Sequence, residues 1–131
     1  MTRMMRAALK YANDYHWYVF PLKHNSKTPL IAEWPTKASL DPSTIRNWWL
    51  SNPGSNIGIA CGPSHLVVVD CDVKNPAFNG HESWLDLKAE YQIDDATVTQ
   101  KTPSGGEHIL YHANGNGIHN SSGQLAPGVD I

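Results

Sequence analysis

Apolar residues recur every three to four positions near the start of the chain, which is the period of one face of an α-helix. In residues 2–15 this stripe consists of Met5, Ala8, Leu9 and Ala12. A second stripe at the same spacing, within Gly80–Tyr91, consists of Trp84, Leu87 and Tyr91. The pattern therefore predicts two amphipathic helices over these ranges.

A third helix is predicted from its start signal. Asp41 can cap a helix because its carboxylate accepts hydrogen bonds from unpaired backbone N–H groups. Pro42 suits the first turn, where no N–H is needed, and Asn52-Pro53-Gly54 marks the end of the helix. The apolar side of this helix consists of Ile45, Trp48 and Trp49.

Short runs of strand-forming residues separate these helices. The first run, Trp17 to Phe20, is stopped by Pro21, and a loop follows over residues 23–41. Later runs come in two pairs, and each pair surrounds a turn-forming segment. We expect one hairpin from 56–60 and 65–72 around residues 61–64, and another strand pair from 96–102 and 107–113 around residues 103–106.

These elements predict an α+β fold with largely antiparallel strands flanked by helices. A chain of 131 residues fits one domain with a sizeable core, so we expect residues 1–131 to belong to a single domain. Residues 114–127 are rich in Asn, Gly and Ser, and we expect a mobile loop there. The chain stops at Gly128-Val129-Asp130-Ile131, which reads as the start of a further strand.

Composition narrows the class of protein. The chain has a net charge of −2 and a pI of about 6.3, so no overall basic field indicates nucleic-acid binding. Binding to DNA would depend on a local patch, a bound metal or further sequence. No apolar run is long enough to span a membrane, and we expect no membrane partner. Cys61 and Cys71 are too few for a disulfide framework, and we interpret them as small buried hydrophobes of a cytoplasmic protein.

Two acids follow an apolar strand at Asp70-Cys71-Asp72. Alternate side chains of a strand face the same way, so both carboxylates are expected on one face. Two like charges so close repel each other, and a hard cation such as Mg²⁺ or Mn²⁺ relieves the repulsion. The alternative to a cation site is that these aspartates lie at a strand end and merely cap a turn.

A glycine-rich turn lies before the last long apolar run, at Ser104-Gly105-Gly106-Glu107-His108. Glycine lets backbone N–H groups approach a phosphate closely, and His108 adds a donor. Lys27 and Lys101 are further candidate phosphate partners, although most lysines are simply solvated. The alternative for the turn is a plain hairpin whose histidine happens to begin a strand.

Several motifs follow one another in a recognisable order, from Lys27-x-Pro29 through the helix that starts at Asp41-Pro42 to the two motifs above and Gly128-Val129-Asp130. This ordered set resembles the N-terminal catalytic domain of the bifunctional primase–polymerase (prim-pol) branch of the archaeo-eukaryotic primase superfamily. The resemblance covers most of the chain. It implies a primase–polymerase-like catalytic core and template-directed nucleotidyl transfer by a two-metal mechanism.

The resemblance also implies roles for individual residues. Asp70 and Asp72 match the paired metal-binding acids of the first catalytic motif, and Asp130 matches the third catalytic acid. Ser104 and His108 match the contacts to the nucleoside triphosphate. The implied cofactor is Mg²⁺ or Mn²⁺, and the implied partners are a DNA template and primer and an NTP or dNTP.

The family pattern continues beyond the third acid with an Arg-Gly segment, a glycine-rich strand and a Pro-Pro-Ser ending, which this sequence does not contain. We therefore expect a C-terminally truncated catalytic domain, which in the full-length protein precedes a helicase domain on a plasmid, phage or integrated element. Two alternatives stay open: a metal-dependent nuclease or phosphodiesterase that uses the same acids, and a non-catalytic nucleotide- or DNA-binding module with the same fold.

Overall fold

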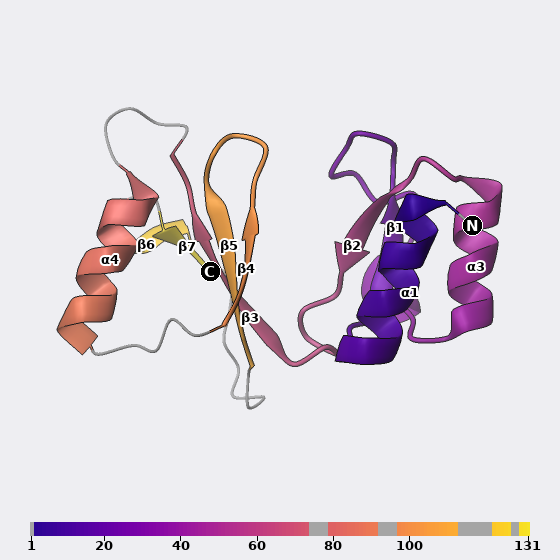
Figure 1. The fold of residues 1–131 in the computed structure, drawn as a ribbon, viewed down its shortest axis with the longest axis horizontal. Helices are drawn as coiled ribbons and strands as arrows, with labels where there is room; N and C mark the ends of the chain where they lie inside the picture. Colours follow the sequence, from indigo (N-terminus) through magenta and orange to yellow (C-terminus); the bar gives the residue numbers. More distant parts are fainter. Residues whose placement is uncertain (1, 74–78, 92–96, 113–121, 127–128) are drawn as a thin grey trace. The chain divides into compact units, whose positions relative to one another are not determined.

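The computed structural model of the chain describes residues 2–73, 79–91, 97–112, 122–126 and 129–131. It divides into two compact units, Met1–Ser64 and His65–Ile131 (Figure 1). Each unit has its own hydrophobic core and its own sheet. That residues 1–131 belong to one catalytic domain stays a prediction.

The first unit contains three helices and two strands in its described residues: α1 (Arg3–Tyr15), β1 (Val19–Leu22), α2 (Trp34–Lys37), α3 (Pro42–Ser51) and β2 (Asn56–Ile59). The expected helix over 2–15 is confirmed, with Thr2 as its cap: the Thr2 hydroxyl accepts from the Met5 N–H at 3.2 Å. Helix α2 is a single short turn within the segment expected to be loop.

Helix α3 starts as its sequence signal predicts. The Asp41 carboxylate accepts from the Thr44 hydroxyl at 2.8 Å and from the Thr44 N–H at 3.2 Å. These hydrogen bonds stabilise the charged form and so lower the pKa of Asp41. The helix ends at Ser51, directly before the predicted Asn52-Pro53-Gly54 stop.

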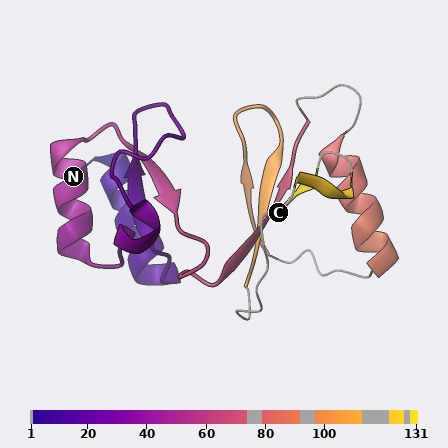
Figure 2. The same ribbon diagram turned by 180° about the vertical axis from the view of Figure 1, so that it is seen from behind.

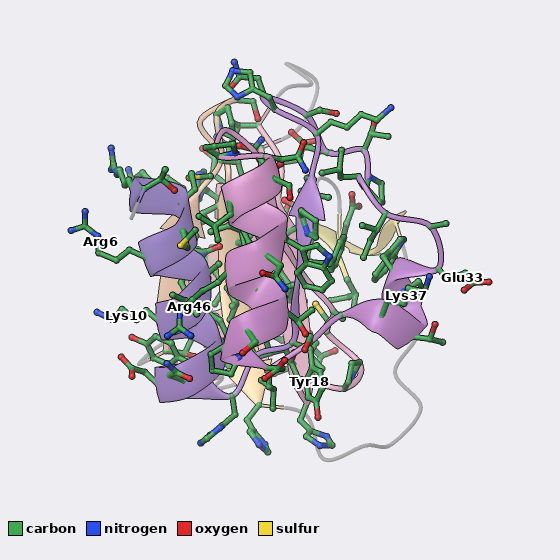
Figure 3. All side chains as sticks on the ribbon, turned by 90° about the vertical axis from the view of Figure 1, so that its right-hand side faces the viewer. Arg6, Lys10, Tyr18, Glu33, Lys37 and Arg46 are labelled. Atoms are coloured by element: carbon green, nitrogen blue, oxygen red, sulfur yellow. The ribbon has the colours of Figure 1, made fainter. Side chains whose placement is uncertain are left out.

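Helices α1 and α3 pack side by side and bury their apolar stripes together (Figure 3). Trp49 is completely buried between them and the sheet, and its indole N–H donates to the Ser55 carbonyl at 3.0 Å. The polar sides face outward: Figure 3 shows Arg6 and Lys10 pointing away from the two helices, and Arg46 of α3 is exposed. The core residues of this unit are Met5, Ala8, Leu9, Ala12, Val19, Ile45 and Trp49.

The expected end of the first strand is wrong. Strand β1 continues through Pro21, which is buried and pairs with Ile57 of β2. A proline has no N–H to offer a neighbouring strand, but its carbonyl can still accept. The Pro21 carbonyl accepts from the Leu30 N–H at 2.9 Å, so the loop that follows satisfies the backbone there.

The expected hairpin between residues 56–60 and 65–72 is also wrong. Both strands exist, but β2 pairs with β1 in the first unit, whereas β3 (Leu66–Cys71) belongs to the sheet of the second unit. The intervening segment ends in Ser64, whose hydroxyl accepts from the Tyr18 N–H at 2.8 Å. The turn residues therefore lead from one sheet to another rather than back along the same one.

The second unit contains β3, α4 (Gly80–Tyr91), β4 (Val98–Lys101), β5 (Glu107–His112), β6 (Ser122–Ala126) and β7 (Val129–Asp130). Its strands form one antiparallel sheet in the order β4-β5-β3-β7-β6, in which β3 is central. The predicted helix over Gly80–Tyr91 and the predicted β4–β5 pair are confirmed.

Helix α4 covers one face of this sheet (Figures 1 and 2). Trp84 is the centre of the contact and packs on side chains of three strands. The buried residues of this cluster are Val69, Cys71, Trp84, Ile109 and Val129. The opposite face of the sheet carries the alternate residues of each strand.

Residues 114–127, expected to form a mobile loop, contain strand β6 over Ser122–Ala126. The remainder of that stretch lies outside the described residues. The predicted α+β class with antiparallel sheets is confirmed. No helix in the described part of the chain is long and apolar enough to cross a membrane.

The close packing of Gly58 provides a test of the first unit. A Cβ at Gly58 would lie 2.4 Å from the Phe20 ring, which is itself stacked on Trp34 with the centroids 4.6 Å apart. We expect Gly58→Ala to lower the free energy of unfolding by about 1–3 kcal/mol, because overpacking forces the rings to move. Urea denaturation measures this change. The matched control is Gly62→Ala, where no atom lies within 4 Å, and an equal loss in both variants would contradict the packing.

Candidate active site

Asp70 lies at the centre of a row of paired residues that crosses the second sheet. In β3 it is directly opposite His108 of β5 on one side and Asp130 of β7 on the other. Directly paired residues of antiparallel strands present their side chains on the same face of a sheet. The fold therefore brings together three of the residues that the sequence singled out.

The row lies on the sheet face that α4 does not cover. Val69 and Cys71, the neighbours of Asp70 in β3, belong to the buried cluster under α4. Because successive side chains of a strand alternate, Asp70 points to the other side. The side chains of Asp70 and His108 are 40% and 39% exposed, which leaves both accessible to a ligand.

Two carboxylates and a histidine lie side by side in this row. His108 Nε2 is 3.5 Å from Asp70 Oδ1, close enough for an ion pair when the ring is protonated. Asp130 is paired directly with Asp70 on its other side, and like charges in that position destabilise a sheet. Positive charge bound over the row would relieve this repulsion.

Asp72 follows the end of β3 and is in phase with Asp70. Its side chain is half-buried, and its backbone carbonyl accepts from the Gly80 N–H at 2.9 Å. This hydrogen bond attaches the start of α4 to the end of β3. The Asp70-Cys71-Asp72 motif therefore lies where the central strand and the helix meet.

The glycine-rich turn packs against the same end of β3. Gly105 has a φ of 87°, which favours glycine, and a Cβ at Gly106 would lie 2.3 Å from the Cys71 carbonyl oxygen. The turn is closed by the Thr102 N–H, which donates to the Gly106 carbonyl at 3.0 Å. Ser104 is exposed at its tip, with its hydroxyl 3.4 Å from that of Thr102. Both sequence motifs thus meet at one edge of the sheet.

The two candidate lysines lie elsewhere. Lys101 is exposed on β4 and pairs with Glu107, so it is in phase with the α4 side of the sheet rather than with Asp70. Lys27 belongs to the first unit, in the exposed segment between β1 and α2, and takes no part in the row.

Sequence reasoning missed three positions. Gln100 of β4 pairs with His108, and Ser122 of β6 pairs with Asp130, so both extend the row by their place in the register. The length of the turn at 102–106 sets the register of the hairpin, so it could have indicated that Gln100 pairs with His108. His81 contacts the glycine-rich turn through the carbonyl of Gly105. No local pattern pointed to that contact.

The donor chemistry of the site suits a hard divalent cation. Mg²⁺ and Mn²⁺ prefer carboxylate oxygens. Such oxygens are carried by Asp70 in β3, Asp72 directly after β3 and Asp130 in the neighbouring strand β7. Within the described residues, no group of three or more His, Cys, Asp or Glu side chains is already arranged to hold a metal ion. The arrangement is thus a set of acids on a shared face beside a turn with phosphate-binding character.

Comparison with known families gives one match. The sequence profile of the bifunctional DNA primase/polymerase N-terminal domain, Prim-Pol, matches residues 8–131. The chain belongs to this family. The Prim-Pol match includes both units and all the residues of the row, and the family performs DNA primase/polymerase-type nucleotidyl transfer, generally with a divalent metal. No curated protein matches the sequence at a significant level.

In this Prim-Pol chain, the alternation that directs Asp70 away from α4 predicts an unreactive thiol at the next residue, Cys71. Burial, and secondarily the charges of Glu107 and Asp70, raise the pKa of the Cys71 thiol to about 12 from its ordinary value of 9.0. At pH 8 about one Cys71 in ten thousand is then a thiolate. We expect iodoacetamide to label the half-buried Cys61 well before Cys71, as measured by peptide mass spectrometry.

Denaturation provides the control for this labelling experiment. In urea both thiols are exposed, so we expect them to react at similar rates. The raised pKa also means that the folded state holds the Cys71 proton more tightly than the unfolded state, so stability falls as the pH rises past 9.0. Equally fast labelling of Cys71 in the folded and denatured chains would contradict the assigned strand faces.

Proposed function

We propose that the chain carries the catalytic centre of a template-directed DNA primase/polymerase, with Asp70, Asp72 and Asp130 as its metal-binding acids. The observation that carries this proposal is the direct pairing of Asp70 with both His108 and Asp130 across three strands. Two acids and a histidine from distant parts of the chain share the face of the sheet that α4 does not cover, and the glycine-rich turn packs against the same end of β3.

The acids and the turn have different roles in this proposal. The carboxylates hold Mg²⁺ or Mn²⁺, and the bound cations would supply the Lewis-acid charge that activates the 3′-hydroxyl of a primer and stabilises the departing pyrophosphate. His108, Ser104 and the amides of Gly105 and Gly106 bind the triphosphate of the incoming NTP or dNTP. They hold its phosphorus in line with the attacking oxygen.

The remaining candidates extend the proposal. Lys101, one residue before the turn, and Lys27, in the first unit, are proposed to contact phosphates. A DNA template and primer are the proposed macromolecular partners, and a helicase domain is the proposed neighbour in the full-length protein. The net charge of −2 means that affinity for DNA would come from local groups and bound cations rather than from an overall field.

Asparagine substitutions test the acids directly. We expect Asp70→Asn, Asp72→Asn and Asp130→Asn each to reduce primer synthesis on single-stranded DNA by at least about 10²-fold, because an amide cannot supply the charge that binds the cation. Incorporation of a labelled dNTP measures this. Asp86→Asn, at an exposed acid of α4, is the control and should keep full activity. Loss of DNA cleavage instead of synthesis in the same variants would favour the nuclease alternative.

Cation binding can be tested without any activity. A cation that binds only the folded state at ten times its dissociation constant adds about 1.4 kcal/mol of stability, or about 6–11 °C in melting temperature for a unit of this size. We expect Mn²⁺ to raise the melting temperature of the wild type and of Asp86→Asn. It should not raise that of Asp70→Asn. An equal rise in all three proteins would place the cation elsewhere.

A further inference from the structure

His81 lies in the first turn of α4, between two acceptors of the β4–β5 connection. Its Nδ1 is 2.8 Å from Glu107 Oε1, and its Nε2 is 3.2 Å from the carbonyl oxygen of Gly105. The side chains of His81 and Glu107 are 34% and 25% exposed, so the contact is partly shielded from water. One imidazole thus connects the helix to both the turn and the strand that follows it.

Both partners of the ring are acceptors. A carbonyl has no proton to give, and an ionised carboxylate has none either. A neutral imidazole carries one N–H and can satisfy one of them, whereas the protonated ring donates to both. The protonated ring also makes the bond to Glu107 a charge-assisted one, which is stronger than a bond between neutral groups.

The helix that carries His81 is itself anchored. The side-chain oxygen of Asn79 accepts from the His81 N–H at 2.9 Å and from the Glu82 N–H at 3.3 Å. The Gly80 N–H donates to the Asp72 carbonyl at 2.9 Å. The ring therefore extends from a capped helix start whose backbone is attached to the end of the central strand.

The contact with Gly105 determines which way a neighbouring amide points. The carbonyl of Gly105 and the N–H of Gly106 belong to the same peptide unit, which is trans. In a trans peptide these two groups point in opposite directions. Because the Gly105 carbonyl is directed at His81, the Gly106 N–H of the same peptide is directed away from His81.

We propose that His81 is a positioning residue for phosphate binding: it fixes the orientation of the Gly105–Gly106 peptide, whose amide binds the triphosphate in the proposed function. This inference rests on the proposed function of that row. Gly106 cannot carry a side chain, because a Cβ would lie 2.3 Å from the Cys71 carbonyl, so the peptide stays close against β3. The contact of His81 with the Gly105 carbonyl then determines the direction of the Gly106 N–H.

Two variants that differ only in reach test the proposal. The amide nitrogen of asparagine lies close to where His Nδ1 lies, and that of glutamine close to where His Nε2 lies. His81→Asn therefore keeps a donor for Glu107 and loses the contact with Gly105, whereas His81→Gln keeps a donor for Gly105. With dATP and Mg²⁺ as the probe, we expect His81→Gln to bind within about twofold of the wild type. We expect His81→Asn to bind about five- to tenfold more weakly, the size of about one hydrogen bond.

A second readout follows the peptide itself without any nucleotide. In ¹⁵N–¹H spectra we expect the Gly106 amide resonance to move in His81→Asn and to stay near its wild-type position in His81→Gln. His24→Asn is the matched control, because His24 Nδ1 contacts the Gly54 carbonyl at 2.8 Å in the first unit. It should change neither the Gly106 amide nor the affinity for dATP.

The outcomes separate this inference from the function on which it rests. Wild-type affinity or an unmoved Gly106 amide in His81→Asn would overturn the role of His81 and leave the proposed function standing. Equal losses of affinity in His81→Asn and His81→Gln would also overturn it, since a general structural role predicts that result. If the wild type does not bind dATP, the proposed function fails and this role fails with it.

Discussion

The antiparallel pairing of β3 with both β5 and β7 is the constraint on which the site depends. It places Asp70 between His108 and Asp130, although these residues are far apart in the sequence. A shift of one residue in either register would turn the partner side chain to the other face of the sheet. The buried cluster under α4 opposes such a shift, because it would expose Val69 and Cys71 to water.

The same pairing places two carboxylates opposite each other, which is unfavourable for the fold alone. Sequences that specify one structure usually avoid such conflicts, and where they keep one it often lies at a functional site. Membership of the Prim-Pol family gives this conflict a chemical meaning, since the family generally uses a divalent metal. The half-exposed state of Asp70 and His108 fits the same interpretation.

Helix α4 stabilises the site from the covered face of the sheet. Trp84 packs on the strands, the Gly80 N–H is bonded to Asp72, and His81 reaches the glycine-rich turn. The helix thus contacts both the Asp70-Cys71-Asp72 motif and the glycine-rich turn from the side of the sheet opposite to Asp70. The acids, the turn and the start of α4 are thus connected. The helix binds backbone carbonyls of Asp72 and Gly105, and the carboxylate of Asp70 lies on the opposite face of the sheet.

Local signals in the sequence determined much of this fold: the helical periods, the Asp41 cap and the β4–β5 turn. These features depend on neighbours within a few residues, so periodicity and turn chemistry are enough to find them. Tertiary structure alone decided that β2 pairs with β1, that β3 lies between β5 and β7, and that His81 meets Gly105. Strand partners are chosen by burial of whole faces against distant segments, and no local pattern encodes that choice.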